Sequence, residues 1–341
     1  MQRILQICPH DSSPFGELCD RYRIAAETFG CEVVTVYLGP ARGLEWLSST
    51  YLGVQELASH RAISAAMAPF AATPWDLVIC HRYRAYRAAA SVGLARKRCV
   101  VVAHEYGLLA RWPRRVHRAL FSRSCRFAGI APALAAELGE ITGNPLVLQN
   151  VVDVAAAKRV FLTRVEAREQ LQLDGDDLTV GIVGRLHYKK RPDLALDAFK
   201  GFAERYPRSR LVVLGDGKER SKLEMRAVPN ARFAGHVPDA IRVFKAFDIL
   251  LHTAEVEAFG MVVLEAMLAG VPVVARRGYG PEYVLGDLGF FAAQDSAGAF
   301  ADALARAAHA DRAELATRSL ARIEQHFSIQ VLADKLKDLL G

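Results

Sequence analysis

The sequence lacks the features of three common protein classes. Its longest apolar run, residues 259–275, contains Glu265 and Pro272 and is too short to span a bilayer. No signal peptide is expected, because the apolar stretch after Arg3 is broken at once by the Pro-His-Asp of residues 9–11. The six cysteines include no Cys-x-x-Cys pair and no metal-ligand spacing. We therefore exclude integral membrane, secreted and disulfide-rich proteins, and expect free thiols packed as small apolar groups in a reducing cytosol.

Composition and charge indicate a folded protein with an uneven distribution of basic residues. Of the 341 residues, 52% are hydrophobic and 24% are charged, which suits two domains with sizeable cores. Residues 1–150 hold 17 Lys/Arg against 11 Asp/Glu, whereas the rest of the chain holds 27 against 26. Nearly all of the net charge of +7 therefore belongs to the first half.

The basic excess is concentrated in residues 82–126, which hold 12 basic side chains and a single acid, Glu105. Such a run is typical of a surface that meets a polyanion or an anionic membrane, and also of solvated helix faces. From Trp112 to Arg126 the arginines alternate with apolar residues in a basic amphipathic pattern that fits docking at a membrane interface. The apolar members of this pattern are Trp112, Val116, Leu120 and Phe127.

Apolar runs rich in Val, Ile and Leu alternate with helix-period segments and predict parallel sheets covered on both faces. The expected strands are residues 3–7, 32–37, 76–80, 99–103, 126–130 and 146–148, then 178–183, 210–214, 231–233, 248–251 and 272–274. The rhythm breaks from Asn150 to about Arg164, the expected linker, and three helices near 296–309, 311–325 and 328–340 close the chain. We predict an α/β protein of two Rossmann-like doubly wound domains, residues 1–150 and 151–341, facing a central cleft. The last helix, about residues 328–341, is a candidate to pack back on the first domain.

A basic glycine loop follows the first strand of the second half. The strand ends at Val183, Gly184 and Arg185 follow, Lys190 comes five residues later, and Pro192 begins a helix. Glycine lets the backbone approach a ligand, and two cations beside a helix N-terminus favour a diphosphate. The alternative is a solvated basic loop.

Two carboxylates bracket an apolar segment in Glu257-Ala-Phe-Gly-Met-Val-Val-Leu-Glu265. Glu257 precedes a helix expected over residues 262–269, whose first N–H groups would face the cleft. Glu265 lies about one turn along that helix, where it can accept hydrogen bonds from vicinal hydroxyls.

These motifs together resemble the retaining family 4 glycosyltransferases of the GT-B fold. Glu-x-Phe-Gly, with a second Glu eight positions after the first, matches the family's E-x7-E signature. The resemblance covers about residues 146–335, with the motifs in order: Gly-Arg-Leu-x-x-x-Lys at 184–190, Gly-Asp-Gly at 215–217, Phe-Ala-Gly-His-Val at 233–237, Glu-Ala-Met-Leu-Ala-Gly-Val-Pro-Val-Val at 265–274, and Pro-Glu at 281–282. The sequence departs from the pattern at Arg191, where the family has Gly, and at Asn150-Val-Val-Asp153, where it has Asn-Gly-Val-Asp.

The resemblance assigns roles residue by residue. Arg185 and Lys190 match the basic pair that holds the donor diphosphate, Glu265 the carboxylate that accepts from the ribose hydroxyls, and Glu257 the one set against the donor sugar. His104 follows the strand 99–103, where similar enzymes place a histidine against the donor sugar, so the catalytic candidates are Glu257, His104, Arg185 and Lys190. The donor site would further include Gly16, Gly184, His236, Val237, Phe259, Gly260, Met261 and Val262.

The resemblance implies transfer of a sugar, with retention, from a UDP-, GDP- or ADP-linked donor to an acceptor hydroxyl. We expect a glycan or glycolipid acceptor in lipopolysaccharide core or another cell-envelope glycan, no metal or other cofactor, and no nucleic-acid partner. The expected location is the cytoplasm, with peripheral contact between the basic first half and the inner face of the cytoplasmic membrane. The alternatives are a sugar-nucleotide epimerase of the same fold, or a polyanion- or membrane-binding module without activity.

Overall fold

The computed structural model describes residues 1–341 except 14, 42–48, 56–58, 97, 122–124 and 174–176. The chain forms two compact units: unit 1 consists of residues 1–153 and 327–341, and unit 2 of residues 154–326. The last helix thus belongs to unit 1. The expected linker carries a helix of its own, α6 (Val154–Val160), which belongs to unit 2.

Unit 1 is built on a parallel sheet of seven strands in the order β3-β2-β1-β4-β5-β6-β7. Its central strands are apolar and buried almost throughout, as a sheet covered on both faces requires. The order reverses between β1 and β4, so unit 1 has its switch point at the carboxyl ends of these two strands. The strands are β1 (Arg3–Cys8), β2 (Glu32–Tyr37), β3 (Ser49–Tyr51), β4 (Leu77–His81), β5 (Cys99–Ala103), β6 (Arg126–Gly129) and β7 (Leu146–Val147).

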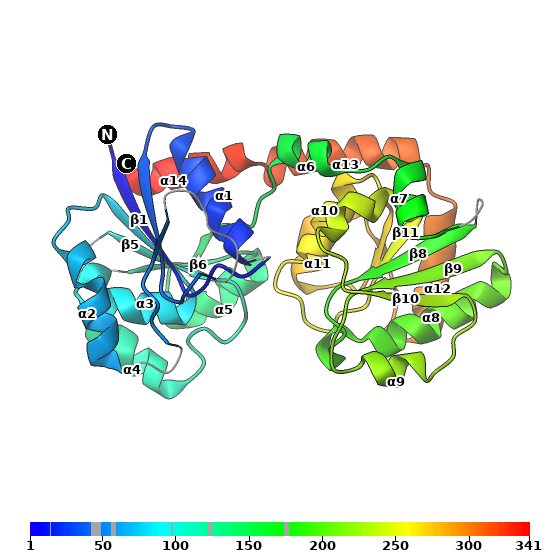
Figure 1. The fold of residues 1–341 in the computed structure, drawn as a ribbon, viewed down its shortest axis with the longest axis horizontal. Coiled ribbons are helices and arrows are strands. Elements are labelled where there is room, and N and C mark those ends of the chain that lie inside the picture. The colour runs from blue at the N-terminus through cyan, green and yellow to red at the C-terminus, as the bar shows by residue number, and fades with distance from the viewer. Residues whose placement is uncertain (14, 42–48, 56–58, 97, 122–124, 174–176) are drawn as a thin grey trace. The chain divides into compact units, whose positions relative to one another are not determined.

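The helices of unit 1 cover both faces of this sheet, with α1 and α14 on one side and α2 and α3 on the other (Figure 1). Helix α14 packs against α1, and the Lys335 ammonium donates to the carbonyl of Val147 at 2.8 Å. The helices are α1 (Phe15–Glu27), α2 (His60–Ala71), α3 (Arg82–Ser91), α4 (Trp112–Phe121), α5 (Pro132–Thr142) and α14 (Ile329–Leu340), with a short 3-10 helix η1 (Leu94–Arg96).

Helix α4 differs from the amphipathic segment expected from the sequence. It ends at Phe121, and Phe127 is a buried residue of β6 (1% exposed), outside the helix. Trp112 and Leu120 are 74% and 65% exposed, so the apolar side of α4 faces outward. Across the described residues no helix combines the length and the apolar character needed to cross a membrane.

Unit 2 holds a parallel sheet of six strands in the order β10-β9-β8-β11-β12-β13. Here the order reverses between β8 and β11, which places the second switch point at their carboxyl ends. The strands are β8 (Leu178–Val183), β9 (Ser209–Leu214), β10 (Ala231–Gly235), β11 (Ile249–His252), β12 (Val273–Ala275) and β13 (Phe290–Phe291).

The core of unit 2 lies between this sheet and helices α8 and α12, which Figure 1 shows together on one side of the strands. Alternate residues of β8, Val180 and Ile182, point into this core, whereas Gly181 faces Phe247 on the other side. A Cβ at Gly181 would lie 2.6 Å from the Phe247 ring, so only glycine fits there. The helices are α6, α7 (Arg164–Gln170), α8 (Pro192–Arg205), α9 (Arg220–Glu224), α10 (Met261–Leu268), α11 (Tyr279–Leu285), α12 (Ala297–Ala308) and α13 (Arg312–His326), with 3-10 helices η2 (Tyr188–Lys190), η3 (Ala240–Ala246) and η4 (Gly286–Leu288).

Candidate functional site

The motifs found in the sequence gather at the switch point of unit 2. The loop after β8 carries Gly184, Arg185 and Lys190, and the loop after the neighbouring strand β11 carries Glu257. Because both loops leave the same edge of a parallel sheet, residues distant in sequence meet there. This is the position at which open α/β sheets bind ligands.

A glycine platform supports the loop after β8. The N–H of Gly184 donates to the carbonyl of Leu214, and that of Leu186 donates to the carbonyl of Asp216, both at 2.9 Å. A Cβ at Gly215, where φ is +143°, would lie 1.9 Å from the carbonyl oxygen of Gly184. The Gly-Asp-Gly motif therefore holds the basic loop in place through close backbone contact.

Backbone and hydroxyl hydrogen bonds tie the two loops together. Thr253 Oγ1 donates to the carbonyl of Arg191 at 2.8 Å, with the carbonyl of Lys190 at 3.1 Å. The N–H of Glu255 donates to the carbonyl of Lys189 at 3.1 Å. Arg191 itself adopts a left-handed conformation with φ of 50°, which explains why glycine suits this position in the family.

Lys190 forms an ion pair with Glu257, and this contact joins two predicted catalytic residues. Their side chains are 39% and 19% exposed. Burial raises the pKa of Glu257, but the charge of Lys190 and hydrogen bonding outweigh it, so the net pKa is lowered and the carboxylate stays ionised. His252 Nε2 lies 3.8 Å from this carboxylate, and burial lowers the pKa of His252 to about 4.

Arg185 is exposed to solvent, and the first residues of α10 are partly exposed. The Arg185 side chain is exposed and, across the part of the chain that the structure describes, has no carboxylate at ion-pair distance. Helix α10 begins at Met261 after Gly260, whose φ is +93°, and none of the side chains that the structure describes caps it. The N–H of Gly280 donates to the carbonyl of Glu257 at 2.9 Å. The N-terminus of a helix favours an anion, and Glu257, which forms the ion pair with Lys190, lies in the segment just before this helix.

The other predicted donor residues are distributed over three elements of unit 2. Glu265 is partly buried in α10, one turn after Met261, and Val262 lies in the first turn of the same helix. Phe259 is 2% exposed and forms part of the core beneath it. The exposed His236 and the adjacent Val237 follow β10, which β9 separates from β8.

The switch point of unit 1 holds the predicted His104. Nε2 of His104 lies 2.9 Å from Nδ1 of His81, and its ring packs edge-on against Phe15, with the centroids 5.0 Å apart. Burial, with help from Arg82, lowers the pKa of His81 to about 3; burial and then His81 lower the pKa of His104 well below its usual value. Both rings are therefore neutral at pH 7. Gly16 lies buried in the first turn of α1.

Four residues at these switch points were not assigned a role from the sequence. His252 and His81 each end a strand, and Cys8 ends β1 beside Cys19 of α1. The ends of adjacent strands could have suggested that His81 and His104 meet. Nothing in the spacing of Cys8 and Cys19 could have suggested their contact, because it depends on how α1 packs against the end of β1.

Comparisons with known proteins agree with the motifs. Residues 163–322 match the family model described as glycosyl transferases group 1. The chain is 30% identical over 189 residues to the lipopolysaccharide core biosynthesis glycosyltransferase LpsE of Rhizobium meliloti (strain 1021), covering 52% of this chain and 54% of that protein. It is 35% identical over 116 residues to the GDP-mannose-dependent alpha-mannosyltransferase of Mycobacterium tuberculosis, covering 33% and 29%. The chain thus spans about half or less of the length of these curated relatives.

Solved structures match along the whole chain. Anabaena Alr3699/HepE in complex with UDP-glucose superposes with a TM-score of 0.80 at 19% identity, covering 100% of this chain and 99% of that chain. A glycosyltransferase from Rickettsia africae superposes with a TM-score of 0.81 at 14% identity, covering 99% and 97%. At these identities the likeness establishes the fold. Residues 163–322 of unit 2 are therefore similar to the glycosyl transferases group 1, and the chain has the GT-B fold of two Rossmann-like domains.

Proposed function

We propose that the protein is a retaining glycosyltransferase that moves a sugar from a nucleotide sugar to the hydroxyl of a glycan or glycolipid. The observation that carries this proposal is the Lys190–Glu257 pair at the switch point of unit 2, next to the exposed Arg185. Two cations beside a helix N-terminus suit a diphosphate, and a diphosphate needs most stabilisation as it leaves. Solved relatives of the same fold bind UDP and UDP-glucose.

In the proposed reaction these residues orient the donor and stabilise its charge. Arg185 and Lys190 hold the diphosphate, Glu265 accepts from the ribose hydroxyls, and Glu257 keeps Lys190 in position beside the donor sugar. The bond from the anomeric carbon to the diphosphate breaks while the acceptor oxygen bonds to the same face of that carbon. A donor phosphate oxygen takes the acceptor proton. No metal takes part at this centre.

The acceptor is proposed to be an envelope glycan, met at the cytoplasmic face of a membrane through unit 1. Helix α4 supports this with its exposed Trp112 and Leu120. Its arginines are partly engaged with unit 1: Arg114 lies over the ring of Tyr83, and Arg115 donates to the carbonyl of Leu109. We therefore assign the docking contact to the two apolar side chains, with the surrounding positive charge favouring anionic lipid.

A thermal-shift screen of UDP-, GDP-, ADP- and TDP-sugars tests the donor site, because a ligand of the native state raises the melting temperature. One nucleotide sugar should stabilise the wild type and Lys189→Ala but not Lys190→Ala. Lys189 is the matched control, since it carries the same charge one residue away and its exposed side chain is outside the ion pair. No shift with any nucleotide sugar would contradict the donor assignment.

Product analysis with the stabilising donor separates transfer from the alternative reaction. Nuclear magnetic resonance of the product should show the anomeric configuration of the donor, in a reaction that needs no added Mg²⁺ or Mn²⁺. An isomerised nucleotide sugar formed without consumption of acceptor would instead identify an epimerase.

A further inference from the structure

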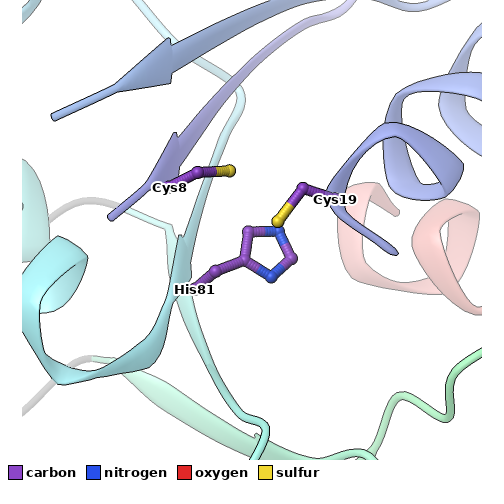
Figure 2. A group of neighbouring side chains, drawn as sticks. All are labelled: Cys8, Cys19 and His81. Atoms are coloured by element: carbon purple, nitrogen blue, oxygen red, sulfur yellow. The ribbon is translucent and has the colours of Figure 1, made fainter. Parts of the chain in front are cut away.

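Two thiols and an imidazole converge at the switch point of unit 1. Cys8 ends β1, Cys19 lies in α1 and His81 ends β4, and Figure 2 shows the three side chains directed toward one another. The two sulfurs and a ring nitrogen lie within 4.8 Å of one another. All three residues are 0% exposed. These are soft ligand atoms brought together from three separate elements.

The free ring nitrogen of His81 faces this group. Nδ1 of His81 is engaged with Nε2 of His104 at 2.9 Å, which leaves Nε2 on the side of the Cys19 sulfur (Figure 2). This Nε2 is buried and has no hydrogen-bond partner among the residues that the structure describes. An unsatisfied buried polar atom is destabilising, so it needs a physical explanation.

Gln6 places a hydrogen-bond donor beside the sulfur of Cys8. Its buried amide Nε2 donates to the carbonyl of Cys19 at 2.7 Å and lies 3.6 Å from the sulfur of Cys8. A neutral thiol is a weak acceptor, whereas an ionised sulfur accepts a hydrogen bond strongly. Outer donors of this kind orient the ligands of a metal.

We propose that Cys8, Cys19 and Nε2 of His81 bind one thiophilic metal ion of the Zn²⁺ class, and that this ion fixes the tautomer of His104. Two thiolates and one imidazole suit Zn²⁺, with a fourth position left for water. Bonds of about 2.3 Å to sulfur and about 2.0 Å to nitrogen place the ligand atoms of a tetrahedral ion about 3.5–3.8 Å apart. The ligand atoms, which lie within 4.8 Å of one another, would have to approach by up to about 1 Å, and the two thiol protons would pass to solvent on binding.

The ion acts on His104 through His81. With Nε2 on the metal, neutral His81 carries its proton at Nδ1 and donates to Nε2 of His104. His104 must then carry its own proton at Nδ1, an atom that is buried and lacks a partner within the described residues. This step rests on the proposed function and on the resemblance of His104 to a histidine set against the donor sugar, to which that N–H would be offered. His81 is thus a positioning residue.

Metal binding tests the site without any measurement of activity. Reduced wild-type protein, stripped of metal, is titrated with Zn²⁺ against a chromophoric chelator, beside Cys8→Ala, Cys19→Ala and Cys31→Ala. Cys31 is the matched control, because it is a buried thiol of unit 1 outside the cluster. We expect one ion per wild-type chain, the same affinity in Cys31→Ala, and affinity lower by about tenfold or more in the other two variants. Failure of the wild type to bind Zn²⁺, or equal binding by all four proteins, would overturn the proposal.

Two further measurements complete the test. Circular dichroism identifies a variant that fails to fold, in which case Cys8→Ser and Cys19→Ser replace the alanine variants. Nitrogen-15 chemical shifts of labelled histidines in the Zn²⁺ form should show His104 protonated at Nδ1 and not at Nε2, and the reverse pattern would refute the coupling. Because neither measurement requires transfer activity, the ion site can fail while the proposed function holds, and the function can fail while the ion site holds.

Discussion

The two units of this chain place different chemistry at the same topological position. In unit 2 the carboxyl ends of β8 and β11 carry a charged, partly exposed group built on Lys190 and Glu257. In unit 1 the ends of β1 and β4 carry Cys8 and His81, both 0% exposed. We therefore propose that the same sheet reversal gives one unit an open site for an anion and the other a buried support for a histidine. The difference shows that topology sets where chemistry is placed and that the loops set which chemistry it is.

The largest effect expected from this contrast follows removal of charge in unit 2. Lys190→Ala should lower kcat/KM by about 10²–10³, because the leaving diphosphate loses a preorganised cation. Lys189→Ala should stay close to the wild type. Steady-state kinetics with His104→Ala sharpens the comparison: we expect kcat to fall while donor affinity is retained. Equal loss of donor affinity in His104→Ala and Lys190→Ala would break the division of roles.

The second effect concerns the platform beneath the basic loop. Gly215→Ala should lower the free energy of unfolding of unit 2 by about 2–4 kcal/mol, since its Cβ would overlap the carbonyl of Gly184 and the backbone there is left-handed. Gly298→Ala is the control, because a Cβ at that position in α12 meets no atom within 4 Å. Urea unfolding measures both. Equal stability of the two variants would show that the loop relaxes freely and needs no platform.

The third effect is a pH dependence that can be assigned to unit 2. His252 has a pKa of about 4 in the folded protein, below its ordinary value, so the unfolded chain binds more protons at intermediate pH. At a pH above the unfolded-state pKa of His252, the side chain is neutral in both states and costs the folded state nothing. As the pH falls toward 4, the unfolded chain gains a proton at His252 that the folded protein does not bind, and the free energy of unfolding falls. Between pH 7 and pH 5 we expect His252 to contribute a loss of about 1–2 kcal/mol.

Urea unfolding of His252→Gln and His236→Gln at the two pH values checks this assignment. The exposed His236 provides the control, and His252→Gln alone should flatten the acid-induced loss. An unchanged slope in His252→Gln would show that other titratable groups cause the acid sensitivity.

The smallest effect concerns α4 of unit 1. Trp112→Glu and Leu120→Glu should each reduce binding to vesicles that contain anionic lipid by a few fold, because apolar contact and attraction to anionic headgroups are both weakened. Met225→Glu, at an exposed apolar residue of unit 2, should not. Vesicle sedimentation measures the three variants. Parallel losses would mean that the contact is general electrostatic attraction and that α4 is not its site.

Sequence reasoning predicted the fold of unit 2 well, because each of its motifs is a short continuous segment next to a predicted strand. Strand β8 was expected at residues 178–183 and is found there, and the start of α8 at Pro192 follows from its proline and its buried Leu194 and Phe199. The Lys190–Glu257 contact depends in addition on the pairing of β8 with β11, which only the structure shows.

Unit 1 was less predictable for physical reasons. Short edge strands such as β3 have too few residues for a periodic signal, and the basic pattern from Trp112 to Arg126 spans the end of α4 and the start of β6. Phe127 belongs to that strand, so the helical periodicity of apolar residues could not show that it lies outside the helix. The group formed by Cys8, Cys19 and His81 depends on tertiary packing and has no signature in spacing.

The return of the chain to unit 1 sets an order for its assembly during synthesis. Unit 2 is a continuous segment, residues 154–326, and can fold as soon as it has left the ribosome. Unit 1 must wait, because α14 covers α1, Ser328 bridges to Val152, and the side chain of Lys335 reaches the carbonyl of Val147. Unit 1 is therefore the first unit to be synthesised in part and the second to be completed, and α1 lacks its contact with α14 until that helix has been synthesised.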